Sequence, residues 1–127
     1  MAESVRFTRD HEWARNEGER VVVGITDYAQ DALGDIVFVD LPEAGRVVAA
    51  GDEVAEVEST KTVSAVMAPL AGEILEVNGA LAAQPEVING DPFGKGWLFT
   101  LRPADPATLD ELMDETAYRA YVEELSR

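Results

Sequence analysis

The segment that decides the fold is VESTKTVS, residues 57–64, in which Lys61 stands between two strand-like runs. Residues 54–57 form the first run, and residues 62–68 form the second. Polar residues between two such runs are typical of a hairpin, in which both strands are held in a sheet and only the turn projects. The sequence therefore predicts that Lys61 lies at the tip of an exposed hairpin.

A lysine at such a tip suits the covalent attachment of a cofactor arm. The acyl acceptor has to be a neutral amine when it attacks, against a reference pKa of about 10.4 for lysine. An attaching enzyme can supply that deprotonation, so the turn needs no special pocket. The alternative is that Lys61 only faces solvent, as most turn lysines do.

The first hundred residues read as short strands separated by turn residues. Strands are expected at residues 21–25, 36–41, 46–49, 54–57, 62–68, 72–77 and 97–101. Several short strands at close spacing predict a mostly β fold of the sandwich or barrel type. Residues 1–127 are enough for a single domain with a core of its own.

One short helix is expected inside this β region. Asp27 can cap its first turn, Gln30 follows three residues later, and Gly34 can end it.

The C-terminal segment, residues 105–127, is expected to form a helical appendage on the β domain. Asp105 and Pro106 form a good helix opening, and helical spacing relates Leu109, Leu112 and Met113. Asp114 is expected to cap a second helix, whose apolar side includes Ala117, Tyr121 and Leu125.

The composition excludes several classes of function. The chain has 25 acidic and 10 basic residues and a formal charge of −15, which disfavours binding to nucleic acid. It has no cysteine, so disulfides, thiolate metal sites and cysteine catalysis are excluded. No membrane-spanning run and no secretory signal are visible. We therefore expect a cytoplasmic protein that does not enter membranes.

Collinear motifs from Phe7 to Leu101 resemble the H-protein family of the glycine cleavage system. The matching blocks are HEW (residues 11–13), GITDYAQ (24–30), LGDIVFV (33–39), VESTK (57–61), EVN (76–78) and GWL (96–98). So many blocks in one order make chance agreement very improbable.

The resemblance implies a barrel-sandwich hybrid fold and a lipoyl group in amide linkage on Lys61. Members of the family shuttle an aminomethyl group from a pyridoxal-phosphate glycine decarboxylase (P protein) to a folate-dependent aminomethyltransferase (T protein). A dihydrolipoyl dehydrogenase (L protein) then reoxidises the arm, and a lipoylating enzyme attaches it. The resemblance thus implies a non-catalytic carrier subunit, with no catalytic residue and no metal of its own, and we expect a monomer.

The chain departs from the family pattern after the lysine. Ser64 matches the family, but Ala65 stands where an acid is usual. In the family that acid lies near the resting place of the loaded arm. Glu12 matches a second acid near that cleft, so we expect Glu12 and Ser64 to contact the arm, with Glu12 as the remaining partner of its amine.

Three other functions compete with glycine cleavage. A lipoyl or octanoyl relay to 2-oxoacid dehydrogenase subunits would use the same lysine. A biotin carrier usually has its lysine between methionines, whereas Thr60 and Thr62 flank Lys61 here. A stand-alone enzyme finds no support, because His11 is the only histidine and has no metal-ligand or nucleophile partners in the sequence. We expect a structural role for His11.

Overall fold

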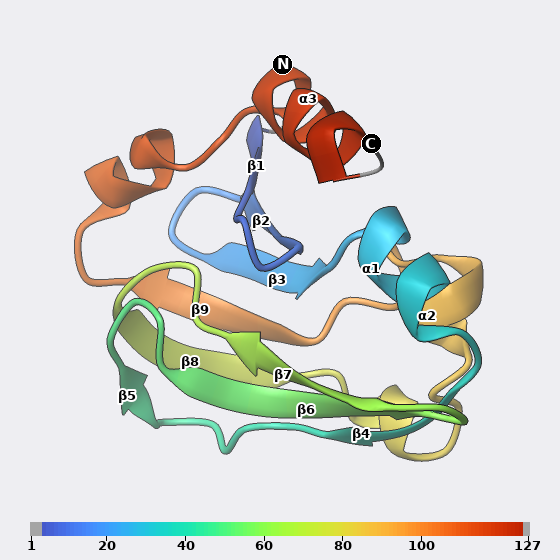
Figure 1. The fold of residues 1–127 in the computed structure, drawn as a ribbon. Coiled ribbons are helices and arrows are strands. Elements are labelled where there is room, and N and C mark those ends of the chain that lie inside the picture. Colours follow the sequence, from blue (N-terminus) through green and yellow to red (C-terminus); the bar gives the residue numbers. More distant parts are fainter. Residues whose placement is uncertain (1–3, 126–127) are drawn as a thin grey trace.

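The computed structural model describes residues 4–125 and contains two antiparallel β-sheets that face each other (Figure 1). The larger sheet contains, in spatial order, β1 (Ser4–Phe7), β2 (Glu12–Asn16), β3 (Val21–Ile25), β9 (Phe99–Pro103), β8 (Gly72–Val77) and β5 (Val47–Val48). The smaller sheet contains β4 (Ile36–Asp40), β6 (Glu53–Ser59) and β7 (Val63–Met67). The predicted mostly β architecture is confirmed.

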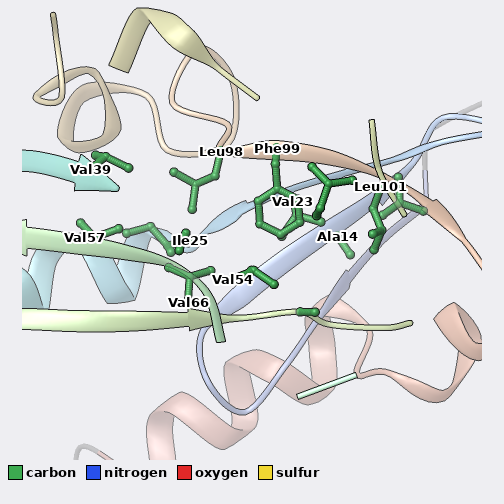
Figure 2. Close-up of a cluster of buried hydrophobic side chains, with 14 of the residues drawn as sticks. Ala14, Val23, Ile25, Val39, Val54, Val57, Val66, Leu98, Phe99 and Leu101 are labelled. Atoms are coloured by element: carbon green, nitrogen blue, oxygen red, sulfur yellow. The ribbon is translucent and has the colours of Figure 1, made fainter. Parts of the chain in front are cut away.

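The main apolar core lies between the two sheets (Figure 2). Val54, Val57 and Val66 of the smaller sheet belong to the same buried cluster as Ile25 and Phe99 of the larger one. Burying a side chain of this size stabilises the fold by about 1.5–3 kcal/mol. This shared core holds the β6–β7 hairpin against the rest of the molecule.

The residues of β3 do not alternate between apolar and polar, because both faces of this strand are buried. Val21, Val23 and Ile25 face the main core, while Val22 belongs to a second cluster. The other buried members of the second cluster are Phe7, Trp13 and Tyr118. The second cluster joins the N-terminal strands to the C-terminal helix, which lies across β1 in Figure 1.

The helical segments are α1 (Asp27–Leu33), η1 (Gly79–Ala82), α2 (Val87–Gly90), η2 (Pro106–Glu111) and α3 (Glu115–Leu125). α1 is the predicted internal helix, and it ends at Gly34, whose φ is 83°. The predicted cap was wrong by one residue. Thr26 Oγ1 accepts the hydrogen bond from Ala29 N at 3.2 Å, and Asp27 is already helical.

The expected opening of the C-terminal segment is confirmed, but the helix that follows is a short 3₁₀ turn. Asp105 Oδ1 accepts from Ala107 N at 3.1 Å, and Pro106 begins η2. η2 ends at residue 111, so Leu112 and Met113 lie outside it. Met113 instead forms a β-bridge with Phe7.

Asp114 caps α3 as predicted, because its Oδ1 accepts from Ala117 N at 2.9 Å. Of the predicted apolar side only Tyr121 packs against the second cluster, whereas Ala117 and Leu125 are exposed. The buried residue of α3 is Tyr118, which the sequence analysis did not place inside. Its ring stacks on Phe7 with centroids 4.7 Å apart, and this contact rotates the helix to that face. Residues 126–127 of the predicted appendage lie outside the described residues.

Two strand predictions also need correction. β1 and β2 were not expected, and the last strand begins at Phe99 rather than Trp97. β2 opens with three buried residues in a row, Glu12, Trp13 and Ala14. A buried acid beside two buried apolar residues hides the alternation by which a strand is recognised.

Candidate cofactor-attachment site

Lys61 lies in the tight turn between β6 and β7, as predicted. Ser59 N donates to Thr62 O at 2.8 Å and closes the turn. The buried Ser59 Oγ accepts from the backbone N–H groups of Lys61 and Thr62, at 3.2 and 3.1 Å. The backbone at Lys61 is therefore held in place while its side chain stays outside.

The hairpin tip rests on the C-terminal end of α1. Thr60 N donates to Asp35 O at 3.0 Å. A Cβ at Gly34 would lie only 3.4 Å from Lys61 Cε, so the aliphatic part of Lys61 passes over this glycine. Glycine suits this position because a φ of 83° disfavours other residues. Contact with α1 gives the lysine stem a defined direction.

The amine of Lys61 is reachable from solvent. Its side chain is exposed, and within residues 4–125 its Nζ makes no hydrogen bond or ion pair. Its Nζ lies 3.8 Å from the position that a Cβ would take at Gly34. An enzyme can therefore approach this amine without first breaking an internal bond.

A small cavity of about 130 Å³ lies next to the hairpin, between α1 and β7. Its walls come from the loop before β2, from β3, from α1 and from the β6–β7 hairpin. Most of the lining is apolar, with Ile25, Ala29, Ala32, Leu33, Val57, Ala65 and Val66. The remaining lining residues are Asp10, His11, Tyr28 and Ser64. An apolar chain with a polar end matches such a lining.

Ser64 lies in the wall of this cavity, three residues from Lys61, and its contact with an arm stays a prediction. Ala65 lies beside it and brings no polar side chain. The carboxylate in the lining comes from Asp10 instead, which sequence reasoning missed. The only hint in the sequence that Asp10 belongs to the site is its position just before the HEW motif. Its loop comes close to β7 only when the chain is folded.

Glu12 is buried but does not line the cavity; its neighbours Asp10 and His11 do. Thr8 Oγ1 donates to its Oε1 at 2.7 Å, and Met67 N donates to its Oε2 at 3.1 Å. Burial raises the pKa of Glu12 to about 7, against the lowering effect of these two bonds. In this arrangement Glu12 fastens the loop before β2 to the edge of β7, and its contact with an arm stays a prediction.

His11 forms part of the cavity wall beside Tyr28, with ring centroids 4.7 Å apart. Its Nδ1 lies 2.9 Å from the hydroxyl of Tyr118. Burial lowers the pKa of His11, while Asp10 opposes that shift. The neutral form of the imidazole is therefore favoured.

Residues 4–125 contain no cluster of three or more His, Cys, Asp or Glu side chains that could hold a metal ion. None of their helices has the length and apolarity to cross a membrane.

Comparison with known proteins agrees with this geometry. The family model for the glycine cleavage H-protein matches residues 5–125. A glycine cleavage system H protein of Thermus thermophilus is 59 % identical over 117 residues, which cover 92 % of this chain and 91 % of the relative. That of Anaeromyxobacter sp. (strain K) is 52 % identical over 124 residues, covering 98 % and 97 %.

A solved structure shows the same fold. The crystal structure of a glycine cleavage system H protein from Mycobacterium marinum matches with a TM-score of 0.85 at 41 % identity, over 100 % of both chains. This likeness confirms the barrel-sandwich hybrid. On the family match, the sequence identities and the shared fold, the chain belongs to the glycine cleavage H-protein family.

Proposed function

We propose that this chain is a lipoyl carrier, with the lipoyl group in amide linkage on Nζ of Lys61. When bound, that group supplies a dithiolane that takes up the aminomethyl group of glycine at one enzyme and gives it up at another. The chain itself supplies an exposed amine, a fixed turn and a nearby apolar cavity. Family membership supports the carrier role, which is a non-catalytic one.

The residues around Lys61 fit an attached arm. Ser59 fixes the backbone of the turn, and Gly34 leaves room for the lysine stem. Ser64 and Ala65, three and four residues after Lys61, line the cavity, and we expect an acyl chain on Lys61 to rest there. Acylation removes the positive charge of the amine, which lowers the cost of placing the arm against apolar walls.

The partners of such a carrier are glycine decarboxylase, aminomethyltransferase and dihydrolipoyl dehydrogenase, together with a lipoylating enzyme. We place the chain with them in the cytoplasm, as a monomer. The comparisons do not favour the alternative role as a relay to 2-oxoacid dehydrogenases. Loss of the protein is expected to block glycine use and to spare 2-oxoacid oxidation.

The observation that carries this proposal is that the amine of Lys61 is exposed and has no hydrogen-bond or ion-pair partner within residues 4–125. Intact mass spectrometry after incubation with a lipoylating enzyme, lipoate and ATP tests it. We expect one lipoyl addition, which Lys61→Arg abolishes. Lys95 is the only other lysine in the chain and is also exposed, so Lys95→Arg is the matched control and keeps the addition. An addition that survives Lys61→Arg would overturn the proposal.

A further inference from the structure

His11 has an unusual backbone conformation at the wall of the cavity. Its φ of 69° is the only positive value at a non-glycine residue within residues 4–125. Its N–H donates to Thr8 O at 3.2 Å, and its carbonyl accepts from Thr26 N at 2.9 Å. Left-handed backbone at a residue other than glycine persists where its surroundings enforce it, and it concentrates at functional sites.

A chain of hydrogen bonds connects His11 to the start of α1. Ala29 N donates to Thr26 Oγ1 at 3.2 Å. Thr26 Oγ1 lies 2.7 Å from the Tyr118 hydroxyl, which lies 2.9 Å from His11 Nδ1. Thr26 and Tyr118 are both fully buried, so their hydroxyl hydrogens need acceptors inside the protein.

Only one direction of donation along this series of hydrogen bonds gives every hydroxyl hydrogen an acceptor. If Thr26 donates to Tyr118 and Tyr118 donates to His11 Nδ1, each hydroxyl accepts one bond and donates one. In the reverse direction Tyr118 donates to Thr26, and the buried hydrogen of Thr26 has no acceptor among residues 4–125. When Tyr118 donates to His11, Nδ1 is an acceptor and has no hydrogen. The single N–H hydrogen of a neutral ring is then on Nε2.

The Nε2 position is free for a ligand. The His11 ring lines the cavity, and within the described residues its Nε2 has no hydrogen-bond partner. The amide of an arm on Lys61 stays near the hairpin, whereas its sulfur atoms are at the far end. A neutral N–H donor suits a sulfur lone pair, and it suits a thiolate better because hydrogen bonds to charged acceptors are stronger.

We propose that Tyr118 is a positioning residue, which fixes His11 as the Nε2–H tautomer so that this N–H donates a hydrogen bond to the sulfur end of the arm in the cavity. The inference rests on the proposed attachment of lipoate to Lys61. The assignment of the tautomer does not depend on that attachment, because the hydrogen bonds from Ala29 to His11 are all present in the unmodified protein.

The tautomer is tested in the unmodified protein by ¹⁵N NMR of the imidazole, and His11 is the only histidine in the chain. At pH 7 we expect a hydrogen on Nε2 and none on Nδ1.

Tyr118→Phe keeps the ring that stacks on Phe7 and removes only the hydroxyl, so it should produce a mixture of tautomers. Tyr121→Phe is the matched control, since Tyr121 also stacks on His11 but its hydroxyl donates to Arg9 O. An Nδ1–H ring in the native sequence, or no change in Tyr118→Phe, overturns the proposal.

The contact with the arm is tested by hydrogen exchange of the Nε2–H. In lipoylated and reduced protein, verified by mass, we expect exchange about fivefold slower than in unmodified protein, the size of one neutral hydrogen bond. Tyr118→Phe should remove most of this protection, and Tyr121→Phe should keep it. Equal exchange with and without the arm overturns the contact. A chain that cannot be lipoylated at Lys61 overturns the proposed function instead, while the tautomer measurement still stands.

Discussion

The backbone N–H of Met67 donates to Oε2 of Glu12 at 3.1 Å, across the gap between β2 and the edge of β7. Thr8 donates to the other oxygen, and no basic side chain among residues 4–125 accompanies this buried carboxyl group. The edge of the lysine-bearing sheet is thus fastened by a group that titrates near neutral pH.

Glu12 makes stability depend on pH in the opposite sense to an ion-paired acid. The folded protein keeps the Glu12 proton up to a pKa of about 7, whereas the reference value is 4.5. Its stabilising contribution is fully present below pH 4.5 and is lost as the pH rises through 7. We expect Glu12→Gln to lack this dependence, which amounts to about 1–3 kcal/mol. Urea unfolding at pH 4.5 and 8 measures the difference, with the exposed Glu19→Gln as control. Parallel pH profiles for the native chain and Glu12→Gln would contradict the assignment.

Gly34→Ala should destabilise the fold and disturb the lysine. The φ of 83° and ψ of −154° lie in a region that is nearly restricted to glycine, at a cost of about 1–3 kcal/mol for alanine. The added methyl group would also touch Lys61 Cε, at 3.4 Å. We expect a lower melting temperature together with slower lipoylation of Lys61.

Gly18→Ala separates these two effects. Gly18 has a φ of 89°, and no atom lies within 4 Å of a Cβ placed there. Its substitution should lower stability and leave the lipoylation rate of Lys61 unchanged. If both variants are lipoylated at the same rate, the contact between Gly34 and the lysine stem has no effect on attachment.

Ser59→Ala should loosen the turn that presents Lys61. Its Oγ accepts the backbone N–H groups of Lys61 and Thr62, and removing it leaves both without that acceptor. We expect a loss of about 1 kcal/mol in unfolding free energy and faster hydrogen exchange at these two amides. Ser64→Ala is the control, because Ser64 Oγ makes only a 3.5 Å contact with Ala65 O. Unchanged exchange in Ser59→Ala would show that the strands alone hold the turn.

Asp10→Asn should lower two pKa values together. The carboxylate of Asp10 raises the pKa of His11 and also contributes to the raised pKa of Glu12. Removing the charge while keeping the shape should therefore move both titrations to lower pH, as followed by NMR. Asp31→Asn, an exposed change on α1, should move neither. A shift of only one of the two groups would mean that Asp10 does not face both.

The lysine hairpin could be predicted because its signal is local. Residues 57–64 contain both strand ends and the turn, and the structure places Lys61 outside as expected. The cavity could not be predicted, because its walls come from residues 10–11, 25–33 and 57–66, which only the sheet packing brings together. The same holds for Asp10, which no local pattern connects to β7.

Errors in the helices have tertiary causes as well. Thr26 and Asp27 are both good caps by composition, and Thr26 is selected because its hydroxyl also contacts the buried Tyr118. On α3 the residues at 117, 121 and 125 and those at 118 and 122 have the same helical spacing. Packing against Phe7 decides between these two faces, and that partner lies more than a hundred residues away in the sequence.

The coverage of β3 on both faces has a consequence for any shortened form of this chain. Without α3, Phe7 would lose the stacked ring of Tyr118, and the cluster that also contains Trp13 and Val22 would lose its buried member from the helix. An exposed aromatic and aliphatic surface beside an edge strand favours association between copies of the protein. A chain cut before Glu115 would therefore be expected to self-associate even with the lysine hairpin intact.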